Sequence, residues 1–312
     1  MPKRALVSIG IDVDAVCGWI STYGGADSPN DISRGIFAGE VGVPRLLKML
    51  KKYDIKASWF VPTHSLKTFP KQIAAVRDAG MELGLHGWCH ESPQDMTLEQ
   101  QRDVLDASMK ELTDFCGGVK PVGHVTCWWQ TSKESNKLLR ERGIQYDHSS
   151  QATDCQPFYD VEEYRWTKVD YSQKAESWMK PLERGPLTDL VQVPANWLLD
   201  DLPPHMFMPN KGHTHGFVDA DVTLKLWKSH FDYFYREEEW FVFPLTIHPD
   251  VSGRPNVLMI VEKFIEYCQS HEGVEFVTMK QVNEEFRQRK PFAEALKEHE
   301  EMLKEHEEAL KV

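Results

Sequence analysis

Two pairs of side chains have the types and spacing of a metal-dependent hydrolytic site. Asp12 and Asp14 lie two residues apart at the end of an apolar run, so a strand would place both carboxylates on one face. His86 and His90 are four residues apart, a spacing at which a helical turn or a tight loop can direct two imidazoles to one ion. One carboxylate and two imidazoles are three ligands, which leaves a position open for water, as a catalytic zinc site requires.

A third group of polar residues can complete this chemistry. His248 follows an apolar run and is placed to act as a general acid. Asp200 and Asp201 form an acidic pair that either orients an imidazole or caps a turn. Hydrolysis of an amide suits this set, because an amide resists neutral water. A metal lowers the pKa of water toward about 7, a carboxylate takes a proton and an imidazole returns one to nitrogen.

Further candidates come from the aromatic and sulfur-containing residues. Trp128, Trp129 and Trp197 predict either a stacking wall for a sugar or ring, or plain core. His124 and Cys127 are candidate polar groups of the same pocket, although a small buried thiol is the simpler interpretation of Cys127.

The elements that must position these residues alternate between strands and helices. Strands are expected at 5–11, 57–61, 81–85, 121–125, 145–147, 190–193, 240–247 and 275–277. Helices are expected at 43–52, 70–79, 97–116, 132–142, 219–237, 256–271 and from 278 onward, with an irregular excursion at 149–189. This repetition predicts an α/β fold with a parallel barrel or sheet, and all site segments fall at strand C-termini, where β/α barrels build active sites.

Composition excludes several classes of partner. The 312 residues carry a net charge of -12, which argues against nucleic acid and against an anionic membrane surface. No apolar run reaches the roughly 20 residues of a membrane span, and no signal peptide is visible at the N-terminus. The six cysteines are scattered without a CxxC pair, which favours reduced thiols and a cytoplasmic location.

The last residues differ from the rest in pattern. Residues 1–290 are expected to form one catalytic domain, and residues 291–312 a charged helical tail with a seven-residue repeat. This tail is expected to be a solvated helix lying on its own domain; the alternative is a helix that pairs between subunits. His213 and His215 lie in a glycine-flanked loop, where a structural or rim role is expected before metal chelation.

The ordered motifs resemble the polysaccharide deacetylases with NodB homology (carbohydrate esterase family 4). The resemblance is carried by the paired Asp at 11–14, the two-His motif at 86–90, and the downstream segments 194–204 and 244–255. It covers about residues 4–290 and is strongest for the intracellular branch with peptidoglycan-deacetylase-like and allantoinase-like amidohydrolases.

The resemblance implies a distorted (β/α) barrel with a divalent metal, most often Zn²⁺, with Co²⁺ or Ni²⁺ as alternatives. Asp14, His86 and His90 would be its ligands. Asp12 would be the base that activates water, and His248 the acid that protonates the leaving amine. A homo-oligomer, usual in that branch, is also expected.

Several positions depart from the family pattern. Val125 stands where many members carry an Arg that holds the catalytic Asp. His124, Cys127 and His205 replace residues that are usually aromatic, proline and apolar, respectively. These changes indicate an unusual substrate.

The function expected first is deacetylation of an N-acetyl amino sugar or a short chitin-like oligomer. The alternatives are hydrolysis of a small cyclic amide, imide or N-acyl metabolite, and a non-catalytic ligand-binding relative.

Overall fold

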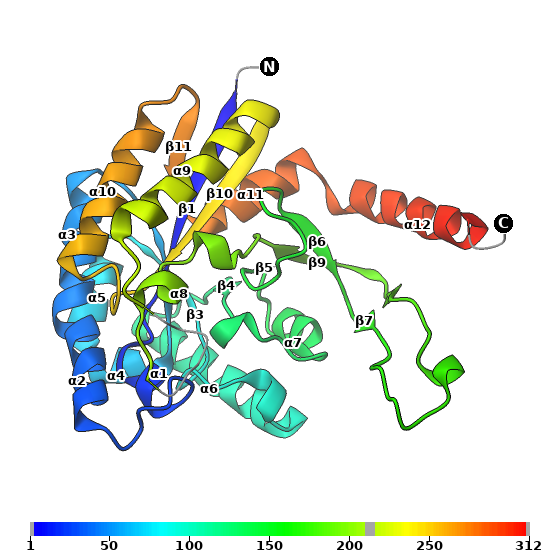
Figure 1. Ribbon diagram of the computed structural model, residues 1–312, viewed down its shortest axis with the longest axis horizontal. Helices are drawn as coiled ribbons and strands as arrows, with labels where there is room; N and C mark the ends of the chain where they lie inside the picture. Colours follow the sequence, from blue (N-terminus) through cyan, green and yellow to red (C-terminus); the bar gives the residue numbers. More distant parts are fainter. Residues whose placement is uncertain (1–2, 210–215, 310–312) are drawn as a thin grey trace.

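A curved, mostly parallel sheet forms the centre of the molecule. The computed structural model describes residues 3–209 and 216–309. The strands follow the order β10-β1-β2-β3-β4-β5-β9-β6, and β11 pairs with β1 beside β2. All of these pairings are parallel except that between β6 and β9. The helices lie around the outside of this sheet (Figure 1).

The strands are β1 (Arg4–Asp12), β2 (Ser58–Val61), β3 (Glu82–Leu85), β4 (Gly123–His124), β5 (Tyr146–Asp147), β6 (Phe158–Val161), β7 (Tyr164–Arg165), β8 (Glu183–Arg184), β9 (Leu187–Gln192), β10 (Trp240–Ile247) and β11 (Val274–Val277). The helices are α1 (Ala15–Ile20), α2 (Pro29–Phe37), α3 (Val43–Lys52), α4 (Thr63–Thr68), α5 (Pro70–Asp78), α6 (Leu98–Phe115), α7 (Ser135–Glu141), α8 (Leu202–His205), α9 (Ala220–Glu237), α10 (Pro255–Gln269), α11 (Met279–Arg289) and α12 (Phe292–Ala309).

The sheet closes on itself through one short contact. An isolated parallel bridge joins Asp200, in the segment after β9, to Thr246 near the end of β10. His148, after β5, reaches the same strand through a 2.9 Å hydrogen bond between its Nε2 and the Thr246 hydroxyl. The fold is therefore a (β/α) barrel whose closure is irregular, which confirms the expected distorted barrel.

Burial on both faces explains the composition of the central strands. Every residue of β10 except the first is buried, and β1 shows the same pattern. Strands covered on both sides read as continuous apolar runs. Phe243 of β10 packs its ring against Phe231 of α9 and Phe264 of α10, and the last two rings also contact each other. Burial of each such side chain contributes on the order of 1.5–3 kcal/mol.

The long, strongly patterned elements were predicted most accurately. The helix at 43–52 and the strand at 240–247 have the expected bounds, and α6, expected from residue 97, opens with a capping box of Thr97 and Gln100. The strand expected at 121–125 is reduced to β4, and the excursion at 149–189 contains β6, β7 and β8. The helices α1 and α2 were not predicted, because their 6 and 9 residues are too short for a clear periodicity.

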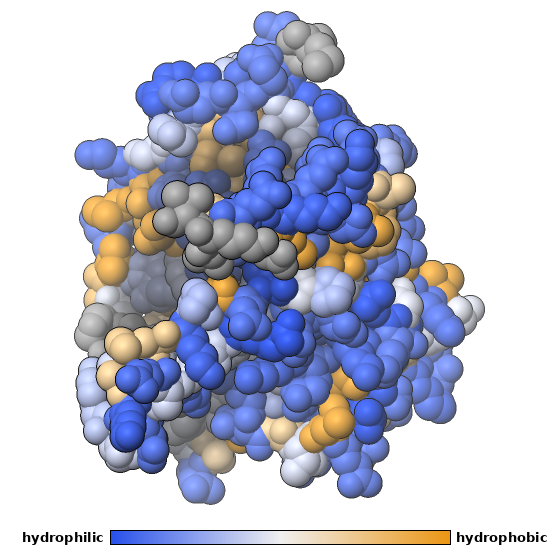
Figure 2. Space-filling model, turned by 90° about the vertical axis from the view of Figure 1, so that its right-hand side faces the viewer, coloured by the Kyte–Doolittle hydropathy of each residue, from blue (hydrophilic) through white to orange (hydrophobic). Residues whose placement is uncertain are grey.

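The tail is helical, as expected, and its first half contacts the barrel. Tyr159 packs its ring against Phe292 at 5.1 Å between centroids, and Ala295 is buried. His299 Nε2 lies 3.3 Å from the Gly185 carbonyl oxygen. Helix α12 and the β7 region project from the same side of the barrel (Figure 1). Viewed from that side, the surface is largely hydrophilic with scattered apolar groups (Figure 2).

No helix in the two described ranges is long and apolar enough to cross a membrane. His213 and His215, considered above as loop histidines, lie outside the described residues.

Candidate functional site

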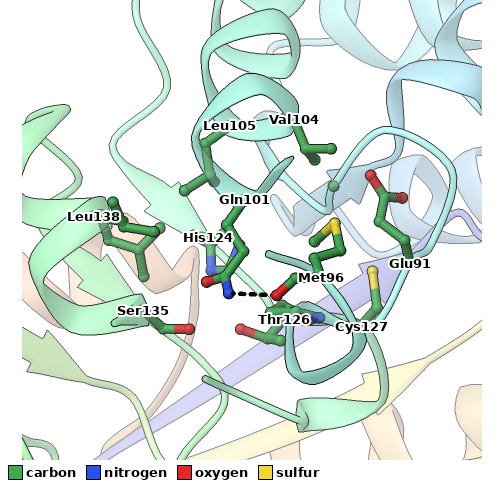
Figure 3. Close-up of a pocket in the computed structure, with 13 residues that line it drawn as sticks. Glu91, Met96, Gln101, Val104, Leu105, His124, Thr126, Cys127, Ser135 and Leu138 are labelled. Atoms are coloured by element: carbon green, nitrogen blue, oxygen red, sulfur yellow. Dashed lines mark hydrogen bonds between the residues drawn. The ribbon is translucent and has the colours of Figure 1, made fainter. Parts of the chain in front are cut away.

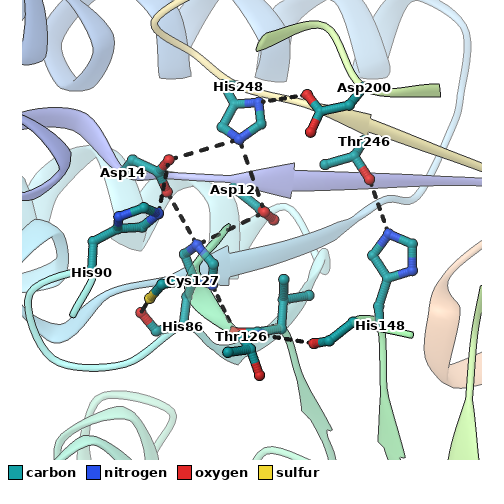
Figure 4. Close-up of polar contacts among 12 residues, drawn as sticks. Asp12, Asp14, His86, His90, Thr126, Cys127, His148, Asp200, Thr246 and His248 are labelled. Carbon is teal, nitrogen blue, oxygen red and sulfur yellow. Dashed lines mark hydrogen bonds and ion pairs between the residues drawn. The ribbon is translucent and has the colours of Figure 1, made fainter. Parts of the chain in front are cut away.

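The predicted site residues converge at the carboxyl ends of three parallel strands. Asp12 is the last residue of β1 and Asp14 lies two residues beyond it. His86 follows β3 directly, and His248 follows β10 directly. Because parallel strands end at one edge of the barrel, residues far apart in the sequence meet there (Figure 4).

Asp14 lies between the two histidines of the second motif. His86 Nε2 is 3.2 Å from Asp14 Oδ1, and His90 Nε2 is 3.3 Å from Asp14 Oδ2. His86 directs its Nδ1 to the Val125 carbonyl oxygen at 2.7 Å, which places the proton on Nδ1 and leaves a lone pair on Nε2. Both His86 Nε2 and Asp14 Oδ1 are buried, and neither has a hydrogen-bond partner among the described residues. Buried nitrogen and oxygen atoms without hydrogen-bond partners are suitable ligand atoms for a divalent metal such as zinc.

The two histidines are carried by a tight loop rather than by a helix. Gly87 and His90 have φ values of +68° and +58°, which turn the chain back on itself. Glu91 fixes this turn by accepting hydrogen bonds from the backbone N–H groups of Trp88 and Cys89. Of the two geometries that a spacing of four allows, the chain adopts the loop.

Cys127 offers an alternative third donor. Its Sγ and the ring nitrogens of His86 and His90 all lie within 4.8 Å of one another. Burial raises the pKa of Cys127 well above its ordinary value, and its thiol donates to the His86 carbonyl oxygen at 3.5 Å. For Asp14, burial opposes ionisation, but His90 and His86 outweigh it and lower the pKa. The charged carboxylate is thus the better ligand, because Cys binds metals as a thiolate.

Two hydroxyl groups from the segment after α1 support the ligands. The Tyr23 hydroxyl donates to Asp14 Oδ2, and Thr22 Oγ1 lies 2.5 Å from His90 Nδ1. Contacts of this kind orient metal ligands and fix histidine tautomers. Sequence reasoning missed both residues, and no spacing signal connects them with the ligands.

Asp12 is placed and charged as a base requires. Its Oδ2 lies 3.8 Å from His86 Nε2 and 4.0 Å from His248 Nε2, and its Oδ1 is buried without a partner in the described part of the chain. Burial raises the pKa of Asp12 to about 6, although the two histidines oppose this rise. A carboxyl with a pKa near 6 can both take up and release a proton near neutral pH.

His248 is held by Asp201, the second residue of the acidic pair Asp200 and Asp201. Its Nδ1 is 2.7 Å from Asp201 Oδ1, and Asp201 also accepts a 2.5 Å hydrogen bond from the Ser252 hydroxyl. Burial opposes protonation of His248, but Asp200 and Asp201 outweigh it and raise the pKa well above its ordinary value. The ring therefore carries two protons at neutral pH, as a general acid must.

The two members of the acidic pair have different contacts. Asp201 orients the imidazole, whereas Asp200 Oδ1 accepts a 2.8 Å hydrogen bond from the backbone N–H of Leu202, the first residue of α8. Asp200 Oδ1 also lies 3.6 Å from His248 Nδ1. Both interpretations of the pair are realised, one by each residue.

The site opens into a cavity of about 280 Å³. One wall consists of Trp128, Trp129 and Trp197, with ring centroids 4.5 Å apart for Trp129 and Trp197 and 6.0 Å apart for Trp128 and Trp197. Trp128 and Trp129 have φ values of +56° and +52°, a left-handed conformation that costs about 1 kcal/mol or more per residue and concentrates at functional sites. The other lining residues are Asp12, Asp14, Tyr23, His86, His90, Thr126, Asp200, Leu202 and His248.

Two of the predicted pocket residues, His124 and Cys127, line a neighbouring cavity instead, together with apolar residues such as Met96 and Leu105 (Figure 3). His124 Nδ1 is 2.8 Å from the buried carboxylate of Asp147. The structure does not bring these two residues to the lining of the metal-ligand cavity, whereas Thr126 lines both cavities.

Sequence comparison connects this geometry with known proteins. A family model described as polysaccharide deacetylase matches residues 33–146. A peptidoglycan deacetylase of Helicobacter pylori is 50% identical over 291 residues, which cover 93% of this chain and 99% of that protein. A peptidoglycan deacetylase-like protein of Gibberella zeae is 38% identical, over 91% of this chain and 87% of the relative.

Solved structures show the same architecture. A Mycobacterium smegmatis protein described as a polysaccharide deacetylase superposes with a TM-score of 0.78 at 27% identity, over 93% of this chain and 92% of that one. An allantoinase superposes with a TM-score of 0.74 at 22% identity, over 93% and 92% of the two chains, a likeness that concerns the fold alone.

Proposed function

This chain belongs to the polysaccharide deacetylase family, and from that premise we propose that it is a metal-dependent hydrolase of an N-acyl amide bond. The substrate proposed first is an N-acetyl amino sugar, free or at the end of a short peptidoglycan or chitin-like oligomer. The site would hold Zn²⁺ through Asp14, His86 and His90. When bound, such an ion polarises the amide carbonyl and lowers the pKa of water.

The observation that carries this proposal is that a proton acceptor, Asp12, and a proton donor, His248, face each other in one cavity. Their Oδ2 and Nε2 atoms lie 4.0 Å apart, and both line the cavity that contains the three ligands. Asp12, with a pKa of about 6, is the proton acceptor, while His248, with its raised pKa, is the proton donor. Hydrolysis of an amide needs both, because water must lose a proton and the leaving nitrogen must gain one.

The surrounding residues set the geometry of these transfers. Asp201 holds the His248 ring so that Nε2 faces the cavity. Tyr23 holds Asp14, and the tryptophan wall offers flat apolar faces on which a sugar ring can stack. The cavity, at about 280 Å³, lies just below the usual range of about 300–1,000 Å³ for small-molecule sites. A cavity this small favours a single sugar unit over the middle of a polymer.

The same size supports a second candidate, the hydrolysis of a small cyclic amide or imide. Such a ring would fit between the tryptophans and present its C–N bond to the same base and acid. The two candidates differ in their products, because a cyclic amide opens to one product whereas an acetylated sugar releases acetate and an amine.

Assays on protein reconstituted with one equivalent of zinc would test the proposal. Chitin oligomers of two to six sugars, N-acetylglucosamine, cyclic imides and ureides would be compared. Released acetate and new amine would be detected for the sugars, and the ring-opened carboxylate for the cyclic imides and ureides. We expect turnover that depends on zinc, is lost with chelator and returns when zinc is restored. The Asp14→Ala variant should neither bind zinc nor turn over any of these substrates.

The Asp12→Asn variant provides the matched comparison, because it keeps the three ligands but removes the base. It should bind zinc and lose at least about 100-fold in kcat. A wild-type protein that binds zinc but turns over no amide in the panel would overturn the hydrolase proposal. Ligand binding without catalysis would then be the better description.

A further inference from the structure

A second cavity of about 580 Å³ lies behind the turn that carries His248. Helix α8 separates the two cavities, since Leu202 at its start lines the metal-ligand cavity and His205 at its end lines the second one. The polar residues that line this second cavity are Arg34, His205, Asp250, Arg254 and Asn256. The proposed hydrolysis uses none of them.

Two buried acceptor atoms in this cavity have no partner. Asp250 is 6% exposed; its Oδ2 accepts a hydrogen bond of 3.3 Å from the Ala15 backbone, but its Oδ1 is unpaired among the described residues. His205 Nε2 is likewise buried and unpaired within the described ranges. With the ring proton on Nδ1, His205 Nε2 presents a lone pair. An unpaired buried acceptor is unfavourable, and a ligand with N–H groups would relieve this cost.

Arginine side chains provide the complementary donors. The Arg254 guanidinium lies over the Phe37 ring, with its Cζ 3.5 Å from the ring centroid. Across the described chain, no salt bridge or hydrogen bond occupies its N–H groups. Arg34 lies over the Trp19 ring, donates to the Phe207 carbonyl oxygen at 2.8 Å and pairs with Asp31 at 3.3 Å, so Arg254 is the arginine whose guanidinium is open to a ligand. Planar guanidinium groups fixed on aromatic faces are suited to bind a carboxylate with two hydrogen bonds.

The turn that presents Asp250 and Arg254 is rigid before any ligand binds. The His248 carbonyl oxygen accepts hydrogen bonds from the N–H groups of Val251 and Ser252, at 3.0 and 2.7 Å. The Arg45 guanidinium donates to the Gly253 carbonyl oxygen at 3.0 Å. A preformed turn lowers the entropy lost when a ligand binds.

We propose that this cavity binds a small zwitterion, with a carboxylate on Arg254, beside Arg34, and an ammonium or amide N–H group on Asp250 and His205. An α-amino acid, or the amino acid-like end of a larger substrate, has this chemistry. Neither half alone satisfies the site, because an anion leaves both acceptors unpaired and an amine leaves Arg254 unpaired. Burial, together with the nearby Asp14, raises the pKa of Asp250 to about 7, and a bound ammonium group would favour its charged form.

Titration calorimetry on the zinc-loaded full chain tests the proposal, with glycine, alanine and glutamate as probes. Acetate and methylammonium, the separate halves of glycine, are the matched controls. We expect at least one amino acid to bind about tenfold or more tighter than either half, a difference of about 1.4 kcal/mol. Equal affinity for whole and halves, or no binding by any amino acid, would overturn the proposal.

Variants connect binding with the cavity. Arg254→Met and Asp250→Asn should each weaken amino acid binding about tenfold or more, whereas Arg236→Met should not. Arg236 is a suitable control because its guanidinium also lies over an aromatic ring, Tyr233, but on the exposed face of α9. Should Arg254→Met fail to fold, the isosteric Asp250→Asn variant still tests whether the cavity binds the amino acid. Unchanged affinity in a folded variant would contradict the site.

Acetohydroxamate, which chelates zinc, distinguishes the two sources of such a ligand. Additive binding of the amino acid and the hydroxamate identifies a free metabolite in a separate site. Mutually exclusive binding identifies the acidic arm of a substrate that spans both cavities. This readout does not depend on turnover, so it is separate from the test of the hydrolase proposal.

Discussion

Asp201 contacts His248 twice, through the ring and through the backbone. Its Oδ1 lies 2.7 Å from the ring Nδ1, and both carboxylate oxygens lie 3.0–3.1 Å from the backbone nitrogen of His248. Asp201 itself is fully buried. Asp201 therefore fixes the position of His248 and, together with Asp200, favours the charged form of its ring.

The first prediction concerns the Asp201→Asn variant, which keeps the shape of the side chain and removes its charge. Without that charge, the pKa of His248 falls, so less of the ring is protonated at neutral pH. We expect kcat to fall by about 100- to 10,000-fold at pH 7, the range for loss of general acid catalysis. The alkaline limb of the pH profile of kcat/KM should move to lower pH, measured on zinc-loaded protein.

An exposed carboxylate gives the control for this prediction. Asp189 forms a surface ion pair with Arg140 at 2.9 Å, and Asp189→Asn should leave the pH profile unchanged. An alkaline limb that stays in place in Asp201→Asn would show that another group donates the proton.

The second prediction concerns Tyr23→Phe, which removes the hydroxyl that donates to the ligand Asp14. Loss of such a supporting hydrogen bond weakens metal binding by about 10- to 100-fold. Zinc affinity would be measured by competition with a chromogenic chelator. Tyr267→Phe removes a hydroxyl that donates to the surface carboxylate of Asp232, and it should leave zinc affinity unchanged. Equal zinc affinities in Tyr23→Phe and Tyr267→Phe would show that Tyr23 does not support the metal site.

The residues proposed to perform chemistry could be predicted from the sequence because local pattern determines their positions. Asp12 and Asp14 end a strand, and His86 and His90 follow another, so the topology of a β/α barrel brings them together without further information. The residues that hold them could not be predicted. Tyr23 comes from an irregular segment after a short helix, and only the folded chain shows that it reaches Asp14.

The fold was predictable to the same degree and for the same reason. Helical periodicity predicted α3, and a continuous apolar run predicted β10, each with the correct bounds. The placement of His124 was not predictable, since it depends on which face a strand of two residues turns to the barrel interior. In a strand this short, alternation cannot be counted.

The third prediction concerns Gly42, which lies in the π-helical segment before α3. A Cβ at this position would lie 2.3 Å from the carbonyl oxygen of Pro249, next to His248. Gly42→Ala must therefore displace the turn that carries the general acid. We expect a loss of about 1–3 kcal/mol in the free energy of unfolding and up to about 100-fold in kcat. Urea unfolding and steady-state kinetics would measure these losses.

Glu40→Ala is the control for Gly42→Ala, because Glu40 is exposed in the same segment. It should change neither quantity by more than about 0.5 kcal/mol. A Gly42→Ala variant with wild-type stability would mean that the turn after His248 moves without cost.

The last prediction concerns His148, which stabilises the closure of the barrel only while it is neutral. Its ring bonds the Val193 carbonyl oxygen and the Thr246 hydroxyl, at 3.0 and 2.9 Å. Burial lowers the pKa of His148 to about 4 from its ordinary value of 6.5. Because the unfolded chain binds this proton more readily, the contribution of His148 is complete above pH 6.5 and is lost as the pH falls toward 4.

Urea unfolding of metal-free protein at several values between pH 7 and pH 4 would measure this loss. His148→Gln should be less stable than wild type at pH 7, since it loses part of the hydrogen bonding, but its stability should fall less steeply with acid. Between pH 7 and pH 4, wild type should lose about 3 kcal/mol more free energy of unfolding than His148→Gln, from 1.36 kcal/mol per unit of pKa. His90 has its pKa lowered to about 4 by burial as well, and it titrates equally in both proteins, so it cancels from the comparison. Parallel slopes would show that His148 takes up its proton in the folded barrel as easily as in the unfolded chain.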